Sequence, residues 1–100
     1  MIWNVRLSAK ARRNIIKIPL GVRETFQILL ADLEYTGPIK SNWPHFGKIS
    51  GWNSCYHCHL QKGRPTYVAV WRVVSQSEKL VEVMYVGTHE KARYDRLCRD

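Results

Sequence analysis

The sequence predicts an α+β fold in which a helical hairpin packs on one face of an antiparallel β-sheet. Three observations predict it: a period-two segment at the N-terminus, two helical segments with a very short joint, and three period-two segments in the second half. The expected order is β-α-α-β-β-β, with a possible short C-terminal helix. A chain of 100 residues has room for one domain, which we expect to span residues 1–100.

The N-terminal part of the chain predicts a strand followed by a short, very basic helix. Residues 2–7 alternate with a period of two, with an apolar side chain at every odd position. Ser8 is suited to be the N-cap of a helix over residues 9–18. Pro19 ends this helix or opens the next one, where the missing N–H of proline does no harm.

A longer amphipathic helix is the clearest element of the sequence. Its apolar residues recur with a 3.6-residue period and form a single stripe, which consists of Val22, Phe26, Leu29, Leu30 and Leu33. The run Thr36-Gly37-Pro38 ends the helix. The two helices therefore form a hairpin that must cover one face of the sheet.

The second half of the chain predicts three consecutive strands. Residues 37–53 are rich in proline and glycine, which indicates a loop or an edge segment. Strands over residues 54–61, 66–74 and 80–88 follow, joined by short turns, and such turns make an antiparallel meander. The middle strand is nearly all apolar, so we expect it to be central and covered on both faces. The charged tail from residue 90 is expected to be a short helix or coil.

The net charge predicts a polyanionic partner. The chain has 16 Lys and Arg against 8 Asp and Glu, a formal charge of +8, which suits nucleic acid, an acidic protein or an anionic membrane surface. No segment approaches the roughly 20 apolar residues that span a bilayer, and the start does not resemble a secretory signal. We therefore expect a cytoplasmic protein without a membrane partner. Its three cysteines, Cys55, Cys58 and Cys98, are an odd number that fits a reducing compartment.

Three stretches of the chain carry a resemblance to a known family. Residues 56–60, Tyr-His-Cys-His-Leu, look like that family's second strand, on which two basic side chains alternate on the open face of the sheet. Residues 85–94 look like its last strand, where a Val-Gly pair leads to a basic residue and then to a tyrosine. Residues 19–24 look like the start of its second helix. The chain resembles the RelE/ParE toxin superfamily in the order of its expected helices and strands, in its number of residues and in its charge. The resemblance covers nearly the whole chain.

The resemblance implies the toxin of a type II toxin–antitoxin system, a RelE-like mRNA interferase. Such a toxin is a ribosome-dependent endoribonuclease that inhibits translation. Its partners would be mRNA, the ribosome and a cognate antitoxin, and the complex with the antitoxin would bind its operator DNA. One branch of the superfamily instead inhibits DNA gyrase and lacks the nuclease residues. A non-nuclease toxin of that kind, or a basic nucleic-acid-binding module, is the alternative.

The chain departs from the family pattern at the positions that matter for catalysis. The lysines of the family's second strand would here be His57 and His59, and the basic residue after the Val-Gly pair would be His89. An arginine usual in the third strand has no clean counterpart, because an ungapped match puts Val68 there. Arg64 or Arg72 is the candidate substitute, which we expect to supply that charge.

Histidines at these positions suit RNA cleavage without a metal ion or cofactor. RNA carries its own nucleophile, the 2′-hydroxyl, so the site needs a base for that proton, an acid for the 5′-oxygen and positive charge on the phosphate. Imidazole, with an unperturbed pKa of roughly 6.5, has both protonation states populated near neutral pH. Strand alternation puts His57 and His59 on one face, roughly 6.5–7 Å apart.

We expect one of these two histidines to take the 2′ proton and His89 to donate a proton to the leaving oxygen. Tyr94 would stack on or orient a base, as aromatic side chains do with unpaired RNA. Five basic side chains are the expected phosphate-binding residues: Lys62, Arg64, Arg72, Lys91 and Arg93.

Other interpretations of the same residues stay open at the level of sequence. Each histidine can be a solvated strand residue without a catalytic role, and Tyr94 can pack against the fold rather than contact RNA. Residues 55–59 match C-x-x-C-H, the attachment pattern of a c-type haem, although they lie on an expected strand and no export signal precedes them. Cysteine and histidine are also zinc ligands, but Cys58 would face away from Cys55 and both histidines, so a site would need the strand to break or Cys98 to approach.

Overall fold

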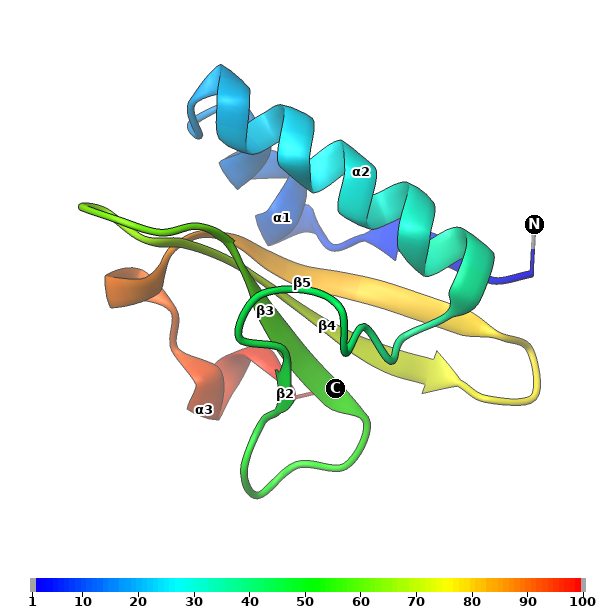
Figure 1. The fold of residues 1–100 in the computed structure, drawn as a ribbon. Coiled ribbons are helices and arrows are strands. Elements are labelled where there is room, and N and C mark those ends of the chain that lie inside the picture. Colours follow the sequence, from blue (N-terminus) through cyan, green and yellow to red (C-terminus); the bar gives the residue numbers. More distant parts are fainter. Residues whose placement is uncertain (1, 100) are drawn as a thin grey trace.

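The computed structural model describes residues 2–99 as two layers and a short tail (Figure 1). Helices α1 (Ala9–Ile15) and α2 (Leu20–Thr36) lie side by side on one face of a five-stranded sheet. The strands are β1 (Asn4–Leu7), β2 (Gly47–Lys48), β3 (Cys55–Gln61), β4 (Tyr67–Ser75) and β5 (Leu80–Thr88). The tail forms a short 3₁₀ helix, η1 (His89–Lys91), and α3 (Tyr94–Leu97), and both lie on the other face of the sheet.

The predicted order β-α-α-β-β-β is confirmed, with small shifts at the ends of elements. The first helix ends at Ile15 rather than Ile18. Two local effects explain this. The Asn14 carbonyl accepts from the backbone N–H groups of Ile16 and Lys17. Ile18 precedes Pro19, and a residue before proline is disfavoured in the α region. Ser8 caps the helix as expected, with its hydroxyl accepting from the Ala11 N–H at 3.1 Å.

The sheet has the strand order β1-β5-β4-β3-β2. The expected meander of β3, β4 and β5 is antiparallel throughout, because short turns between consecutive strands leave no other arrangement. β1 adds to the β5 edge in parallel, with Val5 opposite Val81, so the sheet is mixed rather than wholly antiparallel. β1 is free to pair in this sense because the helical hairpin separates it from the meander along the chain.

The main core lies between α2 and the sheet. The predicted stripe of α2 is buried at Val22, Phe26 and Leu29, together with Leu33. β4 is covered on both faces, as its composition predicted, and its residues from 68 to 71 are 0% exposed. The Trp71 indole N–H, which is deep in this core, donates to the Pro38 carbonyl at 3.0 Å.

A second, smaller core on the opposite face corrects the interpretation of the cysteines. Cys55 of β3 and Cys98, which follows α3, form a disulfide, whereas the sequence analysis took all three cysteines as consistent with a reducing compartment. The two half-cystines are 43 residues apart in sequence, so only the return of the tail across the sheet brings them together. Cys58 is the free thiol; burial raises its pKa to about 12, so it is an inert core residue.

The segment between α2 and β3 is partly ordered by its pairing with the sheet. β2 pairs antiparallel with β3, with Gly47 opposite His57, which fits the expected loop or edge segment. Between residues 2 and 99, no helix is both long and apolar enough to cross a membrane.

Candidate functional site

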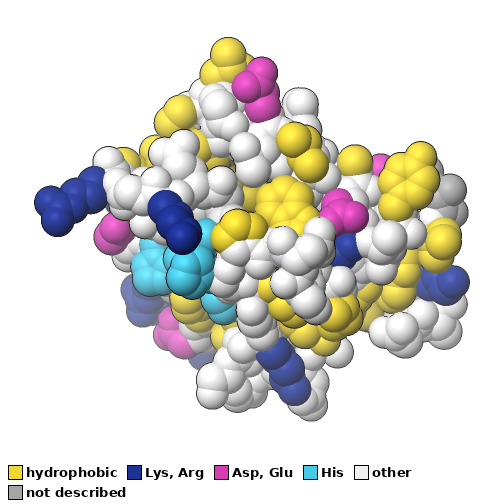
Figure 2. Space-filling model, viewed as in Figure 1, with side chains coloured by type: hydrophobic (Ala, Val, Ile, Leu, Met, Phe, Trp, Pro, Cys, Tyr) yellow, Lys and Arg dark blue, Asp and Glu magenta, His cyan; other side chains and the backbone are white. Residues whose placement is uncertain are grey.

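The four histidines of the chain gather at one end of the face that carries the tail (Figure 2). They come from the loop before β2, from β3 and from η1, and Tyr94 at the start of α3 joins them. We call this group the histidine cluster: His45, His57, His59, His89 and Tyr94.

Ring-to-ring distances show that the cluster is continuous. The rings of His45 and His59 are stacked, with centroids 4.2 Å apart and planes 23° apart. His89 meets the edge of His59 at 5.8 Å and that of Tyr94 at 6.1 Å. Tyr94 in turn lies 5.5 Å from the ring of His57.

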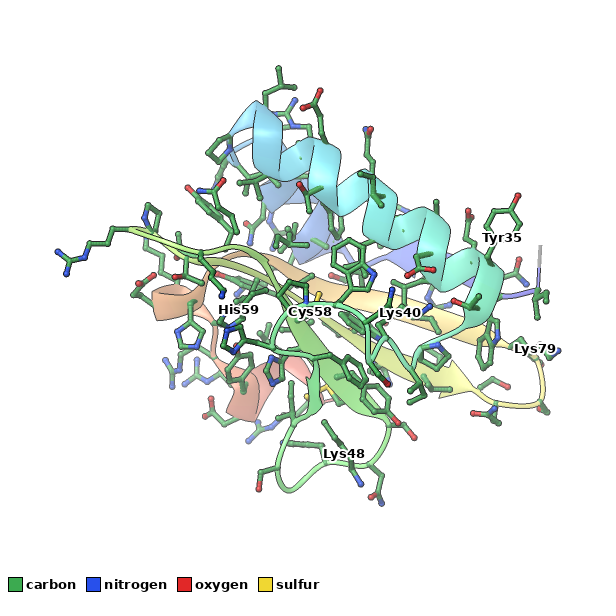
Figure 3. All side chains as sticks on the ribbon, viewed as in Figure 1. Tyr35, Lys40, Lys48, Cys58, His59 and Lys79 are labelled. Carbon is green, nitrogen blue, oxygen red and sulfur yellow. A yellow bond between two sulfur atoms is a disulfide. The ribbon has the colours of Figure 1, made fainter. Side chains whose placement is uncertain are left out.

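The regular alternation of β3 places the two central histidines. His57 lies opposite Val70 of β4 and His59 opposite Val68, so both side chains emerge on the same face of the sheet, as predicted. Cys58, between them, points into the core under the helices (Figure 3). Gly47 of β2 borders the cluster, and a Cβ there would make an ordinary contact of 3.5 Å with the His57 Nε2 atom.

His89 is placed by the end of β5. Its N–H donates to the Thr66 carbonyl at 2.8 Å, which continues the β4–β5 ladder by one residue. The end of β5 is fixed by the Tyr85 hydroxyl, which donates to the Thr88 carbonyl at 2.8 Å. Gly87 is required there, since a Cβ would lie 2.6 Å from the Tyr85 hydroxyl oxygen.

Tyr94 is held over the sheet by the tail. It lies four residues before Cys98, so the disulfide to Cys55 keeps α3 close to β3. Among residues 2–99, the Tyr94 hydroxyl and the Nδ1 atom of His57 are buried with no hydrogen-bond partner. Burial raises the pKa of Tyr94, so its phenol keeps its proton.

The electrostatics of the cluster favour neutral imidazoles on β3. Burial lowers the pKa of His57, and the neighbouring His89 and His45 lower it further. Burial also lowers the pKa of His59, followed by the effects of His45, His89, His57 and Lys62. Both rings are therefore mostly unprotonated at neutral pH, which is the state that a general base requires.

The predicted phosphate-binding residues divide into two groups. Lys62 acts electrostatically on His59, Arg64 follows on the same exposed hairpin, and Lys91 lies in η1 with His89. Figure 2 shows Lys and Arg side chains beside the cyan histidine surface. Arg93 is exposed and lies 3.6 Å from Asp95.

Arg72 is not brought into the cluster. It lies on the same face but opposite Cys55, two residues before His57 in β3. Its guanidinium makes an ion pair with Glu82 at 3.3 Å. The structure therefore gives Arg72 a different neighbourhood from the one that the sequence analysis expected.

His45 is the member of the cluster that the sequence analysis missed. It stands in a loop between Pro44 and Phe46, where no periodicity indicates which way a side chain points. Its backbone has φ of 54°, a left-handed conformation that is uncommon for residues other than glycine, although histidine is enriched there. Only the pairing of this loop with β3 reveals the contact.

The haem and zinc interpretations do not fit the arrangement of the cysteines. Cys55 is bonded to Cys98, and Cys58 is buried on the opposite face of β3, so the C-x-x-C-H motif does not present two thiols together. Across residues 2–99, no group of three or more His, Cys, Asp or Glu side chains is arranged to hold a metal ion.

Known structures share this architecture. The chain is similar to a mutant of the E. coli toxin RelE in the free state, with 22% identity, a TM-score of 0.75 and coverage of 98% of this chain and 95% of that one. It is similar to the archaeal RelE–RelB complex from Pyrococcus horikoshii OT3, with 16% identity, a TM-score of 0.72 and coverage of 92% and 100%. A third likeness is to the YoeB dimer from Staphylococcus aureus, with 13% identity, a TM-score of 0.69 and coverage of 89% and 99%.

These likenesses concern the fold, because the identities are low. No protein-family model matches the sequence, and no curated protein matches it significantly. The structural matches extend over nearly the whole of both chains, including the sheet that carries the histidine cluster. The expected resemblance is therefore confirmed at the level of architecture: the chain has the RelE-like fold.

Proposed function

We propose that this protein is the toxin of a type II toxin–antitoxin system and that it cleaves mRNA on the ribosome, in the cytoplasm, without a metal ion. The observation that carries the proposal is the convergence of four imidazoles and one phenol at the cationic end of a RelE-like sheet. Imidazoles can supply both the base and the acid of the reaction, so the chemistry does not depend on a cofactor.

The reaction would begin with the 2′-hydroxyl of the nucleotide on the 5′ side of the cleaved bond. His59 or His57 takes its proton, and the oxygen attacks the adjacent phosphorus atom. The bond from phosphorus to the 5′-oxygen of the next nucleotide breaks, and protonated His89 gives that oxygen a proton. The products are a 2′,3′-cyclic phosphate and a free 5′-hydroxyl. His89 is suited to the acid role because it comes from a separate element, lies 5.8 Å from the His59 ring, centroid to centroid, and is exposed.

Cations and aromatic groups around the cluster would position the RNA. Lys62, Arg64 and Lys91 extend from exposed segments beside the histidines and would contact phosphates. Arg93 is a weaker candidate because Asp95 competes for it. Tyr94 would orient the RNA through its phenol or by stacking on a base. Such a small, open site holds few contacts to the RNA, and we propose that the ribosome supplies the remaining order.

An antitoxin is the proposed protein partner. One similar structure is described as the intact E. coli RelBE toxin–antitoxin complex, with 24% identity, a TM-score of 0.68 and coverage of 85% of this chain and 94% of that one. The net charge of +8 suits an acidic partner that competes with RNA for the same face. The operator DNA would be a partner of the complex rather than of the free toxin.

The test is expression of the chain in a bacterial host, followed by mapping of mRNA ends at nucleotide resolution. In the host, the expected result is growth arrest with new mRNA 5′ ends in register with the codons. The same mRNA ends should form in a purified translation system that contains excess chelator for metals other than magnesium. A Gln76→Ala variant, changed in the turn between β4 and β5 at the far end of the sheet, serves as the control. Growth arrest with DNA damage and intact mRNA would instead support a gyrase inhibitor.

A further inference from the structure

The loop that joins α2 to β2, residues 37–46, carries an imidazole that the proposed reaction has not yet used. We propose that His45 is a positioning residue for His59: its ring stacks on the His59 ring and selects His59, rather than His57, as the acceptor of the 2′-hydroxyl proton. We further propose that Asp32, Lys40 and Trp43 hold the loop in the conformation that this stacking requires. The inference rests on the proposed function and assigns a role within the same site.

Two contacts fix His59 from the loop side. The ring of His45 lies 4.2 Å from the ring of His59, centroid to centroid. The backbone N–H of His59 donates to the Pro44 carbonyl at 2.8 Å, so successive loop residues hold the main chain and the side chain of one residue. Because His45 has φ of 54°, its conformation is not one that the chain adopts readily, and its surroundings must maintain it.

A charged and hydrogen-bonded network around the buried Lys40 supplies that support. The Lys40 side chain is 2% exposed, and its ammonium lies 3.3 Å from the Asp32 carboxylate. The same ammonium donates to the Asp32 backbone carbonyl and to the Thr36 hydroxyl, and both acceptors belong to α2. The Trp43 indole N–H donates to the other Asp32 oxygen at 2.8 Å. One carboxylate of α2 therefore holds two points of the loop, and Figure 3 shows Lys40 below α2.

The loop is also held on the far side of His45. The ring of Phe46 stacks on Tyr56 at 5.6 Å and on Trp71 at 6.0 Å, both of which belong to the sheet. His45 thus lies between Trp43, tied to α2, and Phe46, tied to the core. A residue bracketed in this way can keep an uncommon backbone conformation and a defined ring orientation.

The environment of His59 explains why it would be selected. Burial lowers the pKa of His59 most, and four groups lower it further: His45 from the loop, His89 from η1, His57 from β3 and Lys62 from the following hairpin. Each of these groups opposes a proton on His59 when it carries a positive charge. His57 is the more buried of the two β3 histidines and lies against Tyr94, whereas His59 lies at the more open end with the two exposed histidines.

Two substitutions at position 45 separate the effect of the His45 ring on the orientation of His59 from the effect of its charge. His45→Phe keeps a flat ring but removes the titrating group, and His45→Gln removes the ring. The imidazole of His59 is titrated by NMR in the full chain, and single-turnover mRNA cleavage on ribosomes is measured from pH 4.5 to 8.5. In both variants we expect the pKa of His59 to rise toward 6.5 and the acid limb of the cleavage profile to move with it. We expect His45→Phe to keep most of the maximal rate and His45→Gln to lose roughly 10- to 100-fold.

The anchor is tested by Trp43→Phe, which removes one hydrogen bond to Asp32 and keeps an aromatic ring in place. We expect weaker NMR contacts between the His45 and His59 rings. We also expect the pKa of His59 to rise, as in the His45 variants. Thr25→Ala, which removes a hydroxyl bond to the Gly21 carbonyl on α2, is the matched control and should change neither.

An active protein in which the His45 variants leave both the His59 titration and the acid limb unchanged would overturn this inference alone. A wild-type chain that cleaves no mRNA would overturn the proposed function, and the role of His45 with it.

Discussion

The disulfide between Cys55 and Cys98 joins the strand that carries His57 and His59 to the helix that begins at Tyr94. His57, His59, His89 and Tyr94 therefore lie within the loop that this bond closes, and His45 is the member of the cluster outside it. This relationship links the stability of the tail to the geometry of the site, and it gives the first prediction.

Replacement of both half-cystines by serine should destabilise the protein and loosen Tyr94 from His57. Opening a loop of 43 residues costs about 4 kcal/mol in the chain-entropy account of disulfides. Urea unfolding of the double variant should show this loss, and wild-type protein unfolded with a reductant should show the same loss. Cys58→Ala is the control, because it changes a buried cysteine outside the disulfide and should leave a dependence on reductant intact. Equal stability with and without reductant would contradict the prediction.

The pair formed by Asp32 and Lys40 should respond asymmetrically to mutation. Asp32→Ala leaves an ammonium that is 2% exposed without its counterion; because the Asp32 carboxylate itself is 29% exposed, we expect a loss of about 3 kcal/mol, the lower end of the range for a fully buried pair. Lys40→Met keeps the buried stem and leaves a carboxylate that is 29% exposed and still accepts from Trp43, so we expect a loss of about 1–2 kcal/mol.

A double-mutant cycle by urea unfolding checks this asymmetry. The double variant should lose less stability than the sum of the single losses, because no buried charge remains without a partner. Additive losses would show that the two side chains do not interact.

Stability should fall as the solution is acidified below pH 6.5. Since the pKa values of His57 and His59 are lowered from 6.5 in the folded protein, chiefly by burial, the unfolded chain binds protons first. The loss begins near pH 6.5 and levels off once the pH passes below the folded values. Asp32, whose pKa is lowered from 3.8 chiefly by the hydrogen bond from Trp43, contributes a separate loss at lower pH.

Urea midpoints at half-unit intervals of pH measure both losses of stability. A variant with glutamine at positions 57 and 59 should lose most of the pH dependence that begins near pH 6.5 and keep the dependence at lower pH. An unchanged loss below pH 6.5 in that variant would assign the effect to other groups.

Substitution of Gly87 by alanine should disturb the turn into η1. The added Cβ would lie 2.6 Å from the Tyr85 hydroxyl oxygen, and overpacking of this kind costs roughly 1–3 kcal/mol. Because Tyr85 holds the Thr88 carbonyl, we expect His89 to shift and cleavage to weaken as well. Gly21→Ala is the matched control: it meets nothing within 4 Å in the first turn of α2 and should stabilise by about 0.5–1 kcal/mol. Equal unfolding midpoints for Gly87→Ala and wild type would contradict the prediction.

Local patterns in the sequence predicted the order of the elements and the core, but not every pairing in the sheet. The 3.6-residue stripe of α2 and the apolar run of β4 each report burial directly, and both were confirmed. The parallel pairing of β1 with β5 and the disulfide were not accessible, because they depend on segments that are far apart in sequence. No spacing rule relates such segments until the sheet is assembled.

The same distinction applies to the site. His57 and His59 share a face because strand alternation requires it, and that part of the site could be derived from two positions in one strand. The resemblance added His89 and Tyr94. His45 could not be found by either route, since an irregular loop gives no periodicity and its contact with His59 depends on pairing between separate segments.

The central claim is that imidazoles from separate elements act on one phosphodiester. Its most direct test is the single-turnover cleavage rate of ribosome-bound mRNA by three alanine variants, at positions 57, 59 and 89, each compared with wild type and with Lys79→Gln at the far turn (Figure 3). We predict losses of about 100-fold or more for His59→Ala and His89→Ala, a loss also for His57→Ala, and none for the control. Wild-type rates in all three alanine variants would contradict the account.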